Sequence, residues 1–270
     1  AVRGSVQLLG NDVRFVPESP LVAGARGCVQ FTEDGFTLAG VQGRALGGPV
    51  VLDGGMRAAP GGEAQVRVRA QGTASAEGLR NAGLWDAVTR LAGHASGSAA
   101  YNLVLGVRRG QAELLVTSDL VGLALQAPPP LAKAAQEALP LRLQRRLTPE
   151  AAATASAPLA DELRIELGQL AHLAYVRALD EAGSARVLRG AIAVGEAALD
   201  PPALPPQGVV ANAVFEDFDA DAWLALLQPP PGLPASPASA ATDTARDYLP
   251  TSVGLRAARL TAGGRTLHRV

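Results

Sequence analysis

The sequence predicts a mainly β protein of the β-rich α+β class, in which an antiparallel meander sheet carries two or three short helices. Three observations predict this class. Apolar and polar residues alternate over many short segments, turn residues separate these segments, and helical spacing of apolar residues occurs in only three places. The chain has 270 residues, which is ample for a buried core.

The strands follow from the alternation. GSVQLLGNDVRF at 4–15 aligns with GCVQFTEDGFTL at 27–38, and each copy predicts a β-hairpin, with turns at 10–12 and 33–35. Further strands are predicted at 47–55, 64–72, 101–107, 114–116, 162–169, 172–179, 185–194, 207–215 and 252–260. The connections between them are short, so neighbouring strands are expected to pair antiparallel.

Helices are predicted where apolar residues recur at helical spacing. These segments lie near 77–92, 129–139 and 220–227, and Asp219 is placed to cap the last one. The helix at 129–139 would begin within three prolines, Pro128 to Pro130, which the first turn of a helix tolerates.

Composition predicts the domain organisation. The segment 148–159 is rich in alanine, serine and threonine, and it is predicted to link a first part, 1–147, to a second part, 160–270. The segment 228–246 is rich in proline, alanine and serine and is predicted to be a flexible loop.

The totals exclude several classes of function. Apolar residues make up 48 % of the chain and charged residues 18 %. No apolar run is long enough to cross a membrane. The apolar excess must therefore fill a core or line a surface that contacts an apolar partner. A net charge of -1 gives no excess of positive charge of the kind that binds nucleic acid. The single cysteine, Cys28, excludes a disulfide framework and a cysteine-based zinc site.

Catalytic motifs are not found. The three histidines, His94, His172 and His268, lack metal-ligand spacing, and the chain has neither a G-x-S-x-G elbow nor a phosphate-binding G-x-x-x-x-G-K-[ST] loop. The carboxylates between Glu216 and Asp221 precede a predicted helix and fit capping better than calcium binding. We therefore predict no catalytic residue, no metal and no cofactor.

One passage resembles a known family. SDLVGLALQAPPPLAKAAQEALPL at 118–141 is similar to a passage of YhdP-like proteins in the AsmA/TamB-like superfamily, where a Ser-Asp-Leu-x-Gly strand end leads into a Leu-Pro-x-Pro-Leu-x-Lys helix and a Pro-Leu strand. GGPV at 47–50, DADAWLALL at 219–227 and LTAGGRTL at 260–267 add weaker similarities. The chain departs from the family at Pro128, where leucine is usual, and in the long insert at 228–246.

The resemblance implies a periplasmic piece of a Gram-negative envelope protein, anchored to the inner membrane by a segment absent from this chain. In such a protein a long curved sheet forms an open hydrophobic groove, and phospholipid moves along it between the inner and outer membranes. The expected partners are phospholipid acyl chains and envelope proteins. Both ends of the chain have strand-like sequence, which is expected of a piece of a longer protein.

Site residues follow from the alternation combined with the resemblance. The predicted groove residues are Val66, Val68, Tyr101, Leu103, Leu105, Leu163, Ile165 and Leu167. The predicted brace helix contains Pro128, Pro130, Leu131 and Lys133. Two alternatives stay open at this point: the groove residues form an ordinary core beneath the helices, or the chain is a scaffolding module that docks envelope proteins through its sheet edges. A hydrolase using one of the histidines is a distant third.

Overall fold

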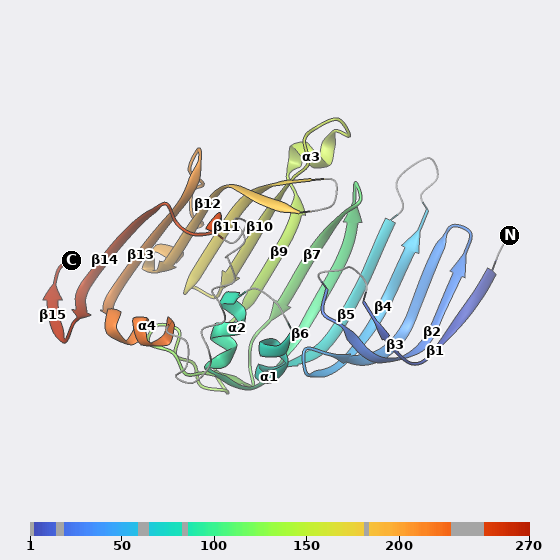
Figure 1. The fold of residues 1–270 in the computed structure, drawn as a ribbon, viewed down its shortest axis with the longest axis horizontal. Helices are drawn as coiled ribbons and strands as arrows, with labels where there is room; N and C mark the ends of the chain where they lie inside the picture. Colours follow the sequence, from blue (N-terminus) through green and yellow to red (C-terminus); the bar gives the residue numbers. More distant parts are fainter. Residues whose placement is uncertain (1–2, 15–18, 59–64, 83–85, 181–183, 228–245) are drawn as a thin grey trace. The chain divides into compact units, whose positions relative to one another are not determined.

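The structure is a computed structural model that describes all residues except 1–2, 15–18, 59–64, 83–85, 181–183 and 228–245 (Figure 1). Within the described residues, fifteen strands form one open, mostly antiparallel sheet. The strands follow one another across the sheet in chain order, except that β8 pairs with β6. The predicted mainly β class is confirmed. The chain divides into two compact units: unit 1 comprises 1–125 and 133–143, and unit 2 comprises 126–132 and 144–270.

Unit 1 is built from long strands joined by tight turns. Its strands are β1 (Arg3–Val13), β2 (Val22–Thr32), β3 (Gly35–Ala45), β4 (Gly48–Arg57), β5 (Gln65–Ser75), β6 (Ala95–Arg108), β7 (Gln111–Ser118) and β8 (Leu123–Leu125). Strand β9 (Leu141–Leu147) begins in unit 1 and ends in unit 2. Consecutive strands from β1 to β7 pair antiparallel, as the alternation predicts, and run side by side in Figure 1.

The first predicted hairpin is wrong, whereas the second is confirmed. Strand β1 continues through Gly10, Asn11 and Asp12, where its register with β2 shifts. The Asn11 side chain accepts a hydrogen bond from Leu9 N (3.0 Å), and Asp12 accepts one from Gly24 N (2.9 Å). Turn-forming residues therefore make a β-bulge here, because their side chains satisfy the backbone groups that the bulge leaves unpaired. The second hairpin joins β2 to β3 at 33–34.

Unit 2 departs from a pure antiparallel meander. Its further strands are β10 (Ala160–Leu167), β11 (Ala171–Leu179), β12 (Ala185–Gly195), β13 (Gly208–Asp219), β14 (Ser252–Ala262) and β15 (Arg265–His268). Strands β12 and β13 are parallel, and so are β13 and β14. Parallel neighbours need a crossover of about a dozen residues or more. The connection 196–207, which begins with the short helix η1 (Glu196–Ala198), supplies one such crossover.

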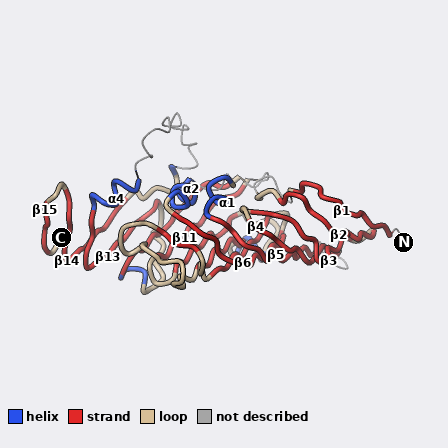
Figure 2. Tube along the Cα trace, turned by 90° about the horizontal axis from the view of Figure 1, so that it is seen from below, coloured by secondary structure: helices blue, strands red, loops and turns tan. Residues whose placement is uncertain are grey.

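The helical segment predicted near 77–92 contains two short helices, α1 (Ala76–Asn81) and α2 (Asp86–Gly93). Ser75 caps α1 by accepting a hydrogen bond from Gly78 N at 3.0 Å. Arg80 on α1 donates to Ala92 O near the end of α2 at 2.8 Å, which ties the two helices together. Figure 2 shows them next to each other, and α1 contacts β5 and β6.

The helix predicted at 129–139 is absent. The segment forms turns, and the backbone of Lys133 pairs with that of Leu125 in both directions, at 2.9 and 3.1 Å. The prolines at 128–130 supply no N–H groups, and this pairing takes up backbone groups that a helix would need. Pro128, Pro130, Leu131 and Lys133 therefore lie in a loop, not in a brace helix.

The segment predicted as a linker, 148–159, contains the short helix α3 (Pro149–Ala153). Thr148 caps this helix by accepting a hydrogen bond from Ala151 N at 3.3 Å. Ala151 is fully buried and packs with Leu147 and Leu179. A short alanine-rich segment thus becomes helical because one small residue fits into a core that residues of β9 and β11 provide.

The helix predicted at 220–227 is confirmed as α4 (Ala220–Leu227), and Asp219 caps it through a hydrogen bond from Ala222 N at 2.9 Å. Its Trp223 ring stacks on Phe218 and donates through Nε1 to Pro129 O at 3.3 Å. Residues 228–245 of the predicted flexible loop lie outside the described residues.

Candidate functional site

The groove residues predicted in unit 1 lie on one face of β5 and β6. Val68 pairs with Leu105, and the pairs Ala70–Leu103 and Gly72–Tyr101 follow along the same two strands. Directly opposed residues share a face, and successive residues alternate between faces. Arg67, Arg69 and Gln71 therefore lie on the other face, where they are exposed. The structure brings all five predicted residues of unit 1 together: Val66, Val68, Tyr101, Leu103 and Leu105.

These five residues differ in burial. Val68 and Tyr101 are buried in a cluster whose other buried members are Val22, Ala25, Leu38, Val41, Ala45, Val50, Leu52 and Ala70. Val66, Leu103 and Leu105 are half-buried at the margin of this cluster. Burial raises the pKa of the Tyr101 phenol. Val68 and Tyr101 therefore belong to the core, and the other three present partly accessible apolar surface.

Strand neighbours, not the helices of unit 1, supply most of this cluster. Every buried residue of the cluster lies on β2 to β6. Helix α1 contributes to a separate cluster in which Ala76 packs with Ala99 and Leu123. The apolar face of unit 1 is thus buried chiefly by side chains of its own sheet.

Unit 2 carries a second apolar face, which includes the predicted residues Leu163, Ile165 and Leu167. Cross-strand pairing arranges this face in rows. The rows are Leu163–Tyr175–Gly190–Val209, Ile165–Leu173–Ile192–Ala211–Val253 and Leu167–Ala171–Val194–Ala213–Leu255. All three rows are apolar across four or five strands.

Burial changes from row to row. Leu163 and Val209 are 2 % and 1 % exposed, whereas Ile165 and Leu167 are half-buried and Val253 is 66 % exposed. A large apolar side chain at that exposure leaves part of the face open to an apolar ligand.

The opposite face of unit 2 is mixed in character. Glu162 forms ion pairs with Arg146 (3.1 Å) and Arg164 (3.2 Å) on this face. Val176 and Ala191 on the same face are nevertheless buried. This face thus combines ion pairs at β9 and β10 with buried apolar residues at β11 and β12.

Sequence reasoning missed a buried polar network at one end of the apolar face of unit 2. Asp161, 1 % exposed, accepts hydrogen bonds from Arg177 Nε (2.8 Å) and Nη2 (2.6 Å) and from Arg145 Nε (2.7 Å). Tyr248 accepts a hydrogen bond from Arg177 Nη1 at 2.8 Å. The signal was available, because Asp161 and Arg177 stand at apolar positions of the alternation in β10 and β11.

The network shifts two pKa values. Burial alone would lower the pKa of Arg177, but the hydrogen bond and the charge of Asp161 outweigh it and raise that pKa. Burial raises the pKa of Tyr175 to about 12, and the neighbouring Tyr248 adds to the shift. The Tyr175 and Tyr248 rings meet edge to face with centroids 5.2 Å apart. The raised pKa values favour the charged form of Arg177 and the neutral form of Tyr175.

Lys133 has a structural role in unit 1. Its ammonium is buried and donates hydrogen bonds to the carbonyls of Leu120 (2.8 Å), Leu123 (2.8 Å) and Ala134 (3.0 Å). It therefore fixes the loop that follows β8.

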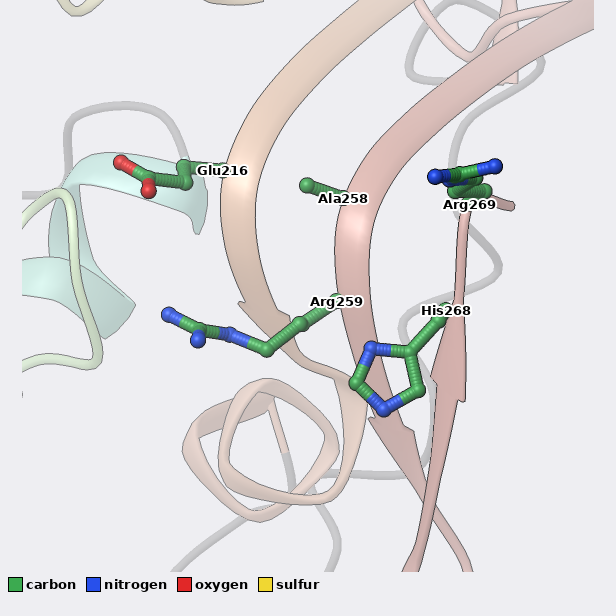
Figure 3. Close-up of a pocket in the computed structure, with 5 residues that line it drawn as sticks. All are labelled: Glu216, Ala258, Arg259, His268 and Arg269. Atoms are coloured by element: carbon green, nitrogen blue, oxygen red, sulfur yellow. The ribbon is translucent and has the colours of Figure 1, made fainter.

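A pocket in unit 2 lies apart from all predicted site residues. Figure 3 shows its lining, which is formed by Glu216, Ala258, Arg259, His268 and Arg269. Arg259 forms a two-point ion pair with Asp217, and this hydrogen bonding lowers the pKa of the Asp217 carboxyl. The lining is charged, so it does not suit an acyl chain.

Among the described residues, no group of three or more His, Cys, Asp or Glu side chains is placed to hold a metal ion. None of the helices in the described part of the chain is long and apolar enough to cross a membrane.

Comparison with known proteins gives one match. The model of the YhdP protein family matches residues 1–270. No curated protein and no solved structure matches the chain. The YhdP family is consistent with the AsmA/TamB superfamily, and the match suggests an AsmA-like envelope protein. Because the match covers the whole sequence, the chain belongs to the YhdP protein family.

Proposed function

We propose that this chain is a segment of an inner-membrane-anchored periplasmic protein, and that its apolar sheet faces carry phospholipid between the inner and outer membranes without catalysis. The observation that carries this proposal is the row Ile165–Leu173–Ile192–Ala211–Val253 in unit 2, which is apolar across five strands and remains partly accessible. The half-buried Val66, Leu103 and Leu105 supply a similar surface in unit 1.

The energetics suit transport. Each methylene of an acyl chain that leaves water contributes about 0.8 kcal/mol, and this contribution needs no directed contact. An acyl chain on an aliphatic face therefore binds without being fixed at one position, as movement along the face requires. Side chains such as Ile192 and Val194 offer the same chemistry from one row to the next.

Native mass spectrometry tests the proposal. The purified chain is incubated with vesicles of phosphatidylethanolamine and phosphatidylglycerol, recovered, and measured for bound phospholipid. Ile192→Asp places a charge on the apolar face, and Asn212→Asp places the same charge at an exposed position on the opposite face. We expect bound phospholipid on the wild-type chain and on Asn212→Asp, and a large loss on folded Ile192→Asp. Equal lipid content in both variants would contradict the proposal.

The scaffolding alternative remains distinguishable. Strands β1 and β15 are the outer strands of the sheet, and Leu9 on β1 is 79 % exposed. A chain that binds no phospholipid but captures an envelope protein, with capture abolished by Leu9→Asp, would favour docking over transport.

A further inference from the structure

The polar network of unit 2 lies at one end of a face that is otherwise apolar. Asp161 and Leu163 are two residues apart on β10, so their side chains lie on one face about 7 Å apart. Arg177 is two residues from Tyr175 on β11 in the same way. Charged groups on an apolar face lose hydration, which costs free energy. This cost is offset where the groups are paired with opposite charges or bind a charged ligand.

The charges of the network do not balance. Arg177 and Asp161 form a complete two-point ion pair, through Nε to Oδ1 and Nη2 to Oδ2. Arg145 contacts the same carboxylate through Nε, so two guanidinium groups share one carboxylate. The surplus is one positive charge, and Arg177 alone is sufficient to neutralise Asp161.

The surplus charge is also the accessible one. The Arg145 side chain is 23 % exposed, whereas those of Arg177 and Asp161 are 7 % and 1 % exposed. The contact with Asp161 uses Nε and fixes the plane of the guanidinium, and it leaves Nη1 and Nη2 outside this contact. Two adjacent N–H donors in a fixed plane match two oxygens of a phosphate group.

We propose that Arg145 binds the phosphate of an anionic lipid headgroup whose acyl chains lie over the half-buried Ile165 and Leu167. This inference rests on the proposed function, since it places the polar end of a lipid at the charged end of the apolar face. Asp161 positions Arg145 by accepting its Nε hydrogen bond, and Arg177 holds the Asp161 carboxylate in place through two further hydrogen bonds. A free phosphate ester offers the same chemistry, so the test includes one.

Binding of three soluble probes to the purified chain tests the proposal. The probes are dihexanoylphosphatidylglycerol, the uncharged dihexanoylglycerol and glycerol 3-phosphate, and their dissociation constants are measured by titration calorimetry. Arg145→Gln removes the surplus charge and leaves the Arg177–Asp161 pair intact. Arg146→Gln makes the same change one residue away, where the side chain pairs with Glu162 on the opposite face. Arg145→Lys keeps the charge without the planar fork.

We expect Arg145→Gln to weaken binding of dihexanoylphosphatidylglycerol about tenfold, in keeping with the loss of charge-assisted hydrogen bonds. Its binding of dihexanoylglycerol should not change, and Arg146→Gln should bind both lipids like the wild-type chain. Arg145→Lys should recover part of the loss, which would exclude unfolding as the cause. Glycerol 3-phosphate should bind at least tenfold more weakly than the phospholipid.

Three results would overturn the inference. If the wild-type chain binds both lipids and Arg145→Gln weakens neither, the headgroup contact is wrong while the proposed function stands. If glycerol 3-phosphate binds as tightly as the phospholipid, the site takes a free phosphate ester and not a lipid headgroup. If the wild-type chain binds neither lipid, the proposed function fails and this inference fails with it.

Discussion

Asp161 and Arg177 face each other directly across β10 and β11 and are joined by two hydrogen bonds of 2.8 and 2.6 Å. Both side chains are almost fully buried. Replacing Arg177 by methionine leaves the Asp161 carboxylate buried with Arg145 as its remaining cation. We expect Arg177→Met to lower the free energy of unfolding by about 3 kcal/mol. Urea denaturation followed by circular dichroism measures it.

The matched control for this pair removes both charges. Asp161→Leu combined with Arg177→Met should be less destabilised than the sum of the single variants, because no buried carboxylate remains. Additive losses would show that the two side chains contribute independently and would contradict their description as one ion pair.

Tyr175 should titrate well above an ordinary tyrosine. Burial favours its neutral form, and the folded pKa of about 12 lies above the unfolded value near 10. A raised pKa contributes stability that is complete below pH 10 and is lost as the pH rises from about 10 to 12. The difference in absorbance at 295 nm between the wild-type chain and Tyr175→Phe should therefore show a midpoint near pH 12. A midpoint near pH 10 would mean that this phenol is solvated.

Lys133 should resist chemical modification. It is the only lysine of the chain, and its buried ammonium donates to three backbone carbonyls. Amine-reactive labelling should thus modify Lys133 slowly in the native chain and quickly after denaturation. Lys133→Met should lower the free energy of unfolding by about 2 kcal/mol, because the carbonyls lose their donor. Equal labelling rates in native and denatured chains would refute this description.

The cap of α3 offers a small and well-defined test. Thr148→Ala removes the side-chain oxygen that accepts from Ala151 N and should reduce stability by about 1 kcal/mol. Thr148→Ser keeps that oxygen and should remain close to the wild-type chain in thermal unfolding. If serine is as disruptive as alanine, packing of the threonine methyl group matters more than the cap.

The strands could be predicted from the sequence because alternation is a local signal. Val66 and Val68 alternate with arginines, and this pattern alone places them on one face. The same signal could not separate Val68, which is buried, from Val66, which is half-buried, because burial depends on neighbouring strands. The confirmed helix α4 follows from a cap and an apolar segment that lie next to each other in the sequence.

The features that could not be predicted depend on contacts between distant residues. Lys133 pairs with Leu125 instead of lying within the predicted helix at 129–139. The spacing of apolar residues carries no information about this pairing. The alternation marks Asp161 and Arg177 as charged residues at apolar positions, but it does not show that Arg145 and Tyr248, from two other segments, join them in one network. The parallel order of β12, β13 and β14 depends on crossovers whose length is visible in the sequence but whose direction is not.

Photocrosslinking tests most directly whether the apolar face of unit 2 holds acyl chains. Benzoylphenylalanine is introduced in place of Ile165 or, as the control, Arg164, which are neighbours on β10 with side chains on opposite faces. Each purified chain is irradiated with phospholipid vesicles, and adducts are identified by mass spectrometry. We expect a phospholipid adduct at position 165 and little or none at position 164. Equal adducts at both positions, or none at 165, would contradict it.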